Sequence, residues 1–159
     1  MTDDYARSLE PLLMQAAGYA RSILRNRADA EDAVQAAALR GLERIGSYDQ
    51  RRPFKGWWFA ILHNCCIDML RHQRRHPSCV LEGDIADERT NERAPDWEAL
   101  DRALETLSPN QQETVRLRYF GGLSYAEIAE VLAIPTGTVM SRLYHARLAL
   151  AAELREDPV

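Results

Sequence analysis

The sequence predicts an all-α fold built from two small helical domains that are joined by a flexible acidic linker. In every long segment apolar residues recur at helical spacing, and no alternating strand pattern appears. Residues 77–96 interrupt this pattern with Pro, Gly, Asn and many acids, which is typical of a linker. We therefore expect domains at residues 1–76 and 97–159, with the linker at 77–96.

The charge is unevenly distributed along the 159 residues, which carry a net charge of −4. Residues 1–76 hold 12 basic and 9 acidic residues, residues 77–97 hold 2 and 6, and residues 98–159 hold 6 and 9. The basic charge is therefore local to the first domain. Hydrophobic residues make up 46% and charged residues 28%, as in ordinary globular proteins.

The sequence shows no sign of membrane insertion or of catalysis. No apolar run approaches the ~20 residues that span a bilayer, and the acidic N-terminus lacks a signal-peptide core, so we expect a cytoplasmic protein. Three cysteines, two of them adjacent, indicate reduced thiols. His72, His76 and Cys79 have a spacing that a metal could use, but Pro77 is expected to end the helix before Cys79. We predict no metal, no cofactor, no catalytic residues and no enzymatic activity.

Two helices are expected before residue 45. Apolar residues from Leu9 to Leu24 form one continuous face of the first helix. Asp29 resembles an N-cap for the second, which should run to about Arg44. Its small apolar residues face inward, while another face carries Asp29, Asp32, Gln35 and Leu39. That face is either a solvated surface, which the periodicity favours, or an acidic docking surface.

A loop over residues 46–53 precedes a third helix that should begin at Pro53 and end near Arg75. Its buried stripe comprises Phe54, Trp57, Trp58, Ile61, Leu62, Cys65 and Met69. Basic residues gather at its C-terminal end, where they suit the helix dipole. Basic groups interleaved with aromatic rings are also what binding of single-stranded nucleic acid requires.

The second domain contains a helix-turn-helix pattern. Helices are expected from Trp97 and from Ser108, and Gly121-Gly122 then leads into the pattern. Ser124 and Glu127 form a capping box, and Pro135 suits the first turn of the next helix. That second helix opens with small polar residues and carries arginines, which favours DNA binding over the alternative of a plain helical hairpin.

Three blocks of sequence in this order resemble the extracytoplasmic-function sigma factors of bacterial RNA polymerase. RADAEDAVQAAALRGLERI is similar to the second helix of sigma region 2, which docks on the polymerase clamp. RRPFKGWWFAILHNCCIDMLRHQRR is similar to the segment that melts the promoter and reads −10. LETLSPNQQETVRLRYFGGLSYAEIAEVLAIPTGTVMSRLYHARLAL is similar to region 4, the −35 reader. ILHN and GTVMSRL further suggest the subgroup that runs general stress responses in alphaproteobacteria.

The resemblance implies a role for individual residues, position by position. The polymerase-binding residues would be Asp29, Glu31, Asp32, Gln35 and Leu39. The −10 DNA-binding residues would be Tyr48, Arg51, Arg52, Phe54, Lys55, Asn64, Arg71 and Arg74. The −35 DNA-binding residues would be Arg118, Thr136, Thr138, Met140, Ser141, Arg142, Tyr144, His145 and Arg147.

This chain departs from the family pattern at three of these places. An acid commonly follows the docking glutamine, but here the residue is Ala36. Many relatives carry Lys or Arg where this chain has Met140 and His145. Because fewer cations attract phosphate less, region 4 alone is expected to bind DNA poorly.

The resemblance implies a transcription initiation factor without catalytic activity of its own. Its partners would be core RNA polymerase, through the β′ clamp and the β flap, promoter DNA and an anti-sigma factor, with no membrane and no small-molecule substrate. Two alternatives remain open. One is a sigma mimic that binds an anti-sigma protein without touching DNA, and the other is a conventional two-domain repressor or activator.

Overall fold

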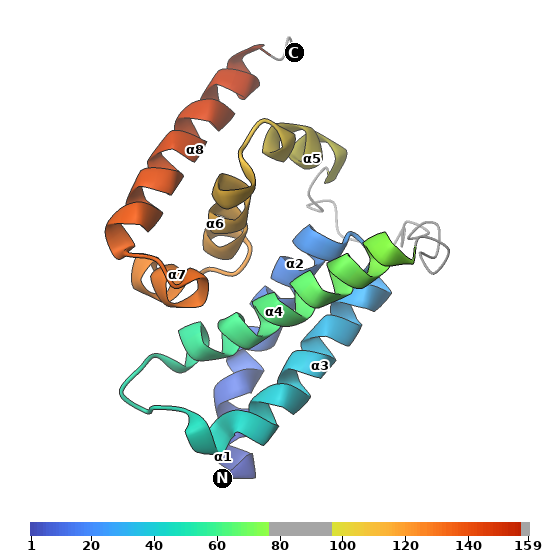
Figure 1. The fold of residues 1–159 in the computed structure, drawn as a ribbon, viewed down its shortest axis with the longest axis vertical. Helices are drawn as coiled ribbons and strands as arrows, with labels where there is room; N and C mark the ends of the chain where they lie inside the picture. The colour runs from blue at the N-terminus through green and yellow to red at the C-terminus, as the bar shows by residue number, and fades with distance from the viewer. Residues whose placement is uncertain (77–96, 157–159) are drawn as a thin grey trace.

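The computed structural model describes residues 1–76 and 97–156, and every regular element within them is a helix (Figure 1). The predicted all-α fold is confirmed, while the predicted linker at 77–96 lies outside the described residues. The first half, residues 1–76, contains α1 (Thr2–Leu9), α2 (Leu13–Leu24), α3 (Arg27–Arg44) and α4 (Phe54–Arg75). The second half, residues 97–156, contains α5 (Trp97–Glu105), α6 (Pro109–Tyr119), α7 (Tyr125–Leu132) and α8 (Thr136–Glu156).

The N-terminal helical segment is broken near Pro11. A 3₁₀ turn, Glu10–Leu12, separates α1 from α2, so the prediction of one continuous helix from Leu9 to Leu24 is wrong. Proline lacks an N–H and its ring crowds the preceding turn, which disfavours an uninterrupted α-helix. As a result Leu13, assigned to the apolar face, is 40% exposed.

Helix α3 begins earlier than the sequence pattern indicated. Asn26 is the N-cap, and its side chain accepts a hydrogen bond of 3.0 Å from the backbone N–H of Asp29. The prediction of Asp29 as the N-cap is therefore wrong, because Asp29 lies within the first turn of α3. The positive end of the helix dipole still stabilises the carboxylate of Asp29 there. Similarly, Pro53 precedes α4 as its N-cap residue instead of opening the helix.

Close contact between α3 and α4 holds the first half together. Gly41 has no side chain, and a Cβ placed there would lie 2.3 Å from the Tyr5 hydroxyl and 3.1 Å from the Trp58 ring. The Tyr5 hydroxyl donates to the Ala38 carbonyl at 2.7 Å and accepts from Trp58 Nε1 at 3.1 Å. Trp58 is fully buried. This buried network fixes the start of α4, and with it the loop that precedes α4.

The second half has the predicted helix-turn-helix. Ser108 and Ser124 both form complete capping boxes, with Gln111 and Glu127. Ala133 ends α7 in the left-handed region, with φ 54°, and this sharp turn redirects the chain into α8. Val139, Leu143 and Ala146, which are spaced four and three residues apart on one face of α8, are fully buried.

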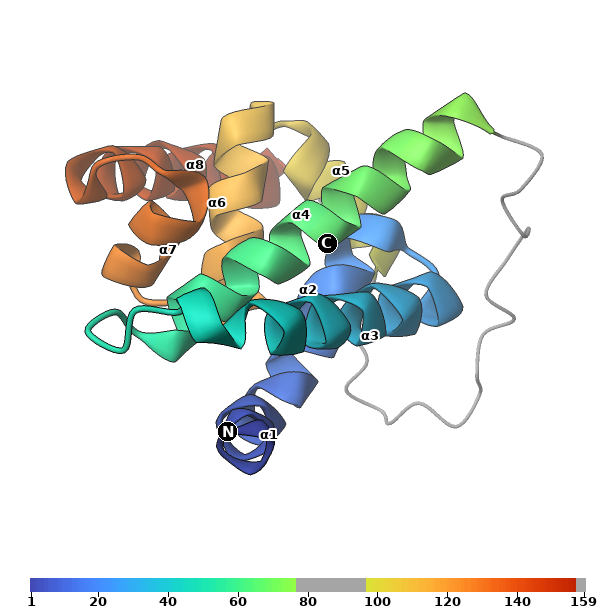
Figure 2. The same ribbon diagram turned by 60° about the horizontal axis from the view of Figure 1, so that its bottom comes forward.

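The two halves pack directly on each other (Figure 2). Helix α4 lies against α7, and α2 lies against α6. Phe59, outside the predicted stripe of α4, is fully buried, and so is Cys66. Among the described residues, no helix is both long enough and apolar enough to cross a bilayer.

Candidate functional site

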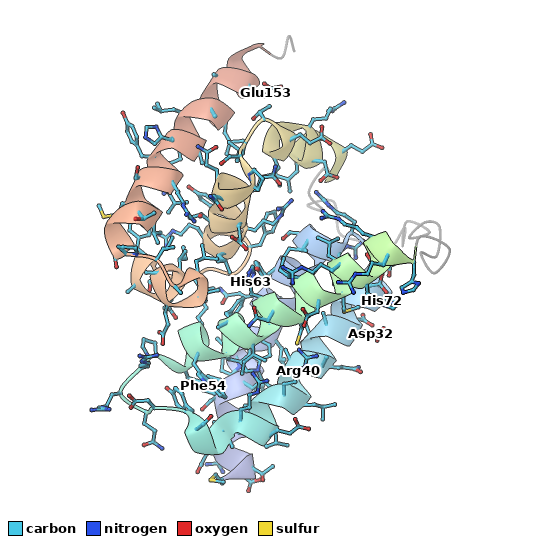
Figure 3. The ribbon with its side chains drawn as sticks, in the orientation of Figure 1. Asp32, Arg40, Phe54, His63, His72 and Glu153 are labelled. Carbon is cyan, nitrogen blue, oxygen red and sulfur yellow. The ribbon has the colours of Figure 1, made fainter. Side chains whose placement is uncertain are left out.

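The predicted polymerase-binding residues lie along α3, and all of them except the half-buried Asp29 are exposed. Asp32 and Gln35 are exposed, and the apolar side chain of Leu39 is 64% exposed beside them (Figure 3 labels Asp32). An apolar side chain held in water on a rigid helix, with acids in the preceding turns, is suited to docking against a partner that is apolar at its centre and basic at its rim. The structure brings these three residues together on one surface of α3.

Asp29 and Glu31 have partners within the first half. The carboxylate of Asp29 accepts a hydrogen bond of 2.7 Å from Gln73 Nε2 on α4. Glu31 pairs with Arg27 one turn earlier, at 3.1 Å. Asp29 also lines a groove of about 410 Å³ between α3 and α4, together with Arg40 and His72. These two acids therefore border the exposed surface formed by Asp32, Gln35 and Leu39, and each already has a hydrogen-bond partner.

An aromatic platform follows the loop between α3 and α4. The ring of Tyr48 packs against Trp57, with centroids 4.9 Å apart, and against Phe54 at 5.7 Å. The Tyr48 hydroxyl donates to the backbone carbonyl of Arg52, which closes the loop on itself. Burial, followed by the nearby acids Glu130 and Asp49, raises the pKa of Tyr48, so the phenol stays neutral and able to donate. These flat, partly exposed rings form a surface on which an unstacked base can lie.

The two loop arginines have different partners. Arg51 is held by Asp49, with Nε and Nη2 each about 3.0–3.1 Å from a carboxylate oxygen, yet its side chain is 90% exposed. The hydrogen bonds from Arg51 lower the pKa of Asp49. Arg52 instead reaches across to the second half, where its Nη1 lies 3.5 Å from Oε1 of Glu130 on α7.

The remaining predicted −10 residues are spread along α4. Lys55 lies next to the loop and donates to Gln15 and to the Gly122 carbonyl. Asn64 is exposed at mid-helix, and Arg71 and Arg74 are exposed near the C-terminal end. At 1.5 Å per residue, Phe54 and Arg74 are about 30 Å apart along the helix axis. Arg71 and Arg74 also line a cleft of about 540 Å³ between the halves.

The exposed face of α8 carries most of the predicted −35 residues. Thr136, Ser141 and His145 are exposed, as are Met140 at 54% and Tyr144 at 60%. Thr138 and Arg142 are half-buried. Two other predicted residues have structural partners: Arg118 donates to the Leu123 carbonyl at 2.8 Å, and Arg147 donates to the hydroxyls of Tyr119 at 2.8 Å and Tyr125 at 3.3 Å. Arg118 and Arg147 therefore tie the helices of the second half together.

The sequence reasoning missed a polar bridge between the halves. The Tyr19 hydroxyl lies 2.8 Å from Nδ1 of His63, and Nε2 of His63 lies 2.9 Å from Glu113 on α6. Burial raises the pKa of Tyr19 well above its usual value, so the phenol keeps its proton beside the imidazole of His63. No local pattern marks a pair 50 residues apart, and only the packing of the halves brings it together.

The cysteine and histidine candidates form no metal centre in the described residues. No cluster of three potential ligands occurs within residues 1–76 and 97–156, and Cys79 lies outside them. The rings of His72 and His76 are 4.6 Å apart. Burial raises the pKa of the Cys66 thiol to about 12, which keeps it protonated and inert.

Comparisons with known families match both halves of the chain. Residues 7–76 match the family model "Sigma-70 region 2", and residues 97–150 match "Sigma-70, region 4". The ECF RNA polymerase sigma factor SigL of Mycobacterium tuberculosis is 36% identical over 149 residues, covering 87% of this chain and 81% of the relative. SigW of Bacillus subtilis is 31% identical over 151 residues, covering 84% and 80%. BldN of Streptomyces coelicolor is 34% identical over 140 residues, and the match spans 53% of its length.

Solved structures share the fold. The sigma factor RpoE of Bartonella quintana, crystallised with the anti-sigma factor NepR, superposes with a TM-score of 0.76 at 26% identity, covering 98% of this chain and 99% of that one. CnrH in complex with the cytosolic domain of CnrY gives the same TM-score at 23% identity, covering 99% and 92%.

Proposed function

The chain belongs to the ECF RNA polymerase sigma factors, and from that premise we propose that it binds core RNA polymerase in the cytoplasm and directs it to promoters with specific −35 and −10 elements. Sigma factors are transcription factors and not enzymes. The observation that carries the proposal is that one chain holds both a partly exposed aromatic platform after α3 and an exposed polar face on a helix-turn-helix. The family's −10 and −35 readers occupy these two places.

The exposed face of α3 is the proposed polymerase-docking surface. Leu39 would bury its exposed side chain against the β′ clamp, while Asp32 and Gln35 contact its polar rim. Asp29 and Glu31 would contribute through the negative field that they add at the edge of this surface. The β flap is the proposed contact of the second half.

The platform of Tyr48, Phe54 and Trp57 is the proposed site of the flipped −10 base. Unstacking a base step costs a few kcal/mol, which stacking on aromatic rings offsets. Arg51, with its side chain 90% exposed, is placed to neutralise a phosphate of the opened strand. Asn64, Arg71 and Arg74 would follow the strand along α4.

The exposed face of α8 is the proposed −35 reader in the major groove. Thr136 and Ser141 are small enough for base edges to approach, and Met140 and Tyr144 offer apolar contact to a thymine methyl group. Arg118 and Arg147 would act by holding α8 in position. With few free cations on this face, affinity would come mainly from the polymerase.

An anti-sigma factor is the regulatory partner that the family supports, since the similar RpoE structure contains the anti-sigma factor NepR. A sigma mimic that binds only an anti-sigma protein is the second candidate. The exposed guanidinium of Arg51 argues against it, because a decoy has no phosphate to neutralise. Run-off transcription with purified core polymerase separates the two. A conventional repressor or activator would instead bind duplex DNA without polymerase, which a gel shift detects.

The test of the −10 assignment is a holoenzyme reconstituted with Arg51→Ala/Arg52→Ala. We expect this variant to bind core polymerase normally and to lose open-complex formation on a linear promoter. Arg102→Ala is the matched control, because it removes an exposed arginine on α5 that belongs to none of the three predicted sets of binding residues. Unimpaired melting by the double variant would show that the loop assignment is wrong.

A further inference from the structure

A small pocket lies between α1 and the loop that joins α3 to α4. It has a volume of about 160 Å³ and lies where α1 meets the 3₁₀ turn Ile45–Ser47 and the start of α4. Its apolar walls are the aliphatic side chain of Ile45 and the rings of Tyr5, Tyr48 and Phe54. Tyr48 and Phe54 also belong to the aromatic platform, so the pocket and the platform share two rings (Figure 3 labels Phe54).

The polar side chains at this pocket come from α1 and from the loop. Asp4 and Ser8 are one helical turn apart on α1, and Gln50 belongs to the loop. All three are exposed, and no hydrogen bond or ion pair engages their side chains within residues 1–76 and 97–156. The pocket therefore combines aromatic walls with a carboxylate, a hydroxyl and an amide that are available to a ligand.

The position of α1 at this pocket is fixed by Tyr5, the residue after Asp4. The Tyr5 hydroxyl donates to the Ala38 carbonyl on α3 and accepts from Trp58 Nε1 on α4. Its ring also meets the ring of Phe54 edge to face, with centroids 5.9 Å apart. A ligand that enters the pocket therefore meets a wall that is already in place, and little binding energy is lost in ordering it.

The charges around the pocket orient a strand that binds at the loop. The guanidinium of Arg51, next to Gln50 in the sequence, belongs to a side chain that is 90% exposed and attracts phosphate. Helix α1 carries two acids in its first turn, Asp3 and Asp4, and these repel phosphate. A bound strand would therefore keep its backbone beside Arg51 and turn a base toward α1.

The carboxylate of Asp4 can distinguish one base from another. An ionised carboxylate accepts hydrogen bonds and cannot donate them. The exocyclic amino groups of cytosine and adenine donate to such an acceptor, whereas thymine and uracil carry a carbonyl oxygen where cytosine carries its amino group. Aromatic rings such as those of Tyr48 and Phe54 stack with any base, so discrimination at this pocket falls to the polar side chains.

We propose that this pocket holds an unpaired base of the opened −10 strand, and that Asp4, with Ser8 beside it, favours a base with an exocyclic amino group over one with a carbonyl oxygen. The inference rests on the proposed function and deepens it, because it gives α1 a part in reading the −10 element. The aromatic platform supplies stacking that is similar for every base, and the polar side chains of α1 supply the choice.

The test measures binding of the complete holoenzyme to promoter DNA whose −10 region is held open as a mismatched bubble. At each −10 position in turn, deoxycytidine is compared with deoxyuridine, which differs only in carrying a carbonyl oxygen in place of the amino group. We expect the wild type to prefer deoxycytidine about five- to tenfold at one position, the lower part of the range that a base-reading side chain contributes. Asp4→Asn should reduce this preference to within about twofold, because an amide both donates and accepts.

Asp3→Asn is the matched control, because it removes the same charge from the same turn of α1 at a residue that does not line the pocket. It should keep the preference of the wild type. Wild-type holoenzyme that binds the promoter with no such preference, or a preference that Asp4→Asn leaves intact, would overturn the proposal. Equal losses in Asp3→Asn and Asp4→Asn would also overturn it, because they would indicate a general effect of charge. Failure of the wild type to bind core polymerase would instead refute the proposed function.

Discussion

Replacing Tyr48 with alanine should weaken promoter opening. The ring is half-buried, packs on Trp57 and Phe54, and presents its remaining face to solvent. Aromatic stacking of an unpaired base contributes about 1–3 kcal/mol, so Tyr48→Ala should reduce the open-complex equilibrium constant roughly 5- to 150-fold. Each lost aromatic pair adds about 0.5–1.5 kcal/mol of local destabilisation, which places the result toward the upper end of that range.

The assay is holoenzyme binding to a promoter that carries a fluorescent base analogue in the −10 element, which brightens when it is unstacked. Tyr48→Phe is the matched control. It keeps the ring and loses only the hydroxyl that donates to the Arg52 carbonyl, so we expect it to stay within about threefold of wild type. Equal effects of Tyr48→Ala and Tyr48→Phe would refute stacking as the function of this residue.

Three further predictions concern the buried network, a thiol and the −35 face. Tyr5→Phe should destabilise the protein by about 1–3 kcal/mol in urea unfolding, because it leaves the buried Trp58 indole N–H without a partner and removes a second hydrogen bond to the Ala38 carbonyl. Burial raises the pKa of Cys66 to about 12, so this thiol should be alkylated about a thousandfold more slowly at pH 8 in the folded chain than in the unfolded chain. Peptide mass spectrometry after iodoacetamide treatment measures that rate. The contribution of the buried thiol to stability is full below about pH 9 and falls as the pH rises toward 12. Met140→Lys should tighten binding to −35 duplex DNA and steepen the slope of log K against log salt by about 0.9, measured by fluorescence anisotropy. An unchanged slope would place residue 140 away from phosphate.

Helix positions and caps were predictable because they depend on neighbours in the sequence. Ser124 and Glu127 satisfy each other's backbone groups within one turn, so the capping box found in the sequence is the capping box in the structure. The break at Pro11 and the cap at Asn26 were missed for a related reason. Several residues nearby could each begin or end a helix, and sequence patterns place such boundaries only to within one or two residues.

The sequence allowed candidate site residues to be named, but it did not predict which of them contact residues that are distant in the chain. Tyr48, Arg51 and Phe54 could be assigned from one stretch of sequence, and the structure brings the rings of Tyr48 and Phe54 into contact where the loop meets α4. The pairing of Arg52 with Glu130 could not be assigned, since the two residues are 78 positions apart and each reads alone as a solvated charge.

Phe59 shows why the packing of the halves escaped the sequence. A helix in a single bundle buries one stripe of side chains. In α4 the fully buried Trp58 and Leu62, which are four residues apart, belong to that stripe. Phe59 follows Trp58 directly, about 100° around the helix, and it is equally buried because α4 has a second covered face beneath Gly121. A large apolar residue that falls outside the main stripe of an amphipathic helix is therefore a sequence signal for a second packing partner. In this chain that partner is the second half, whose Gly121 lies against the ring of Phe59.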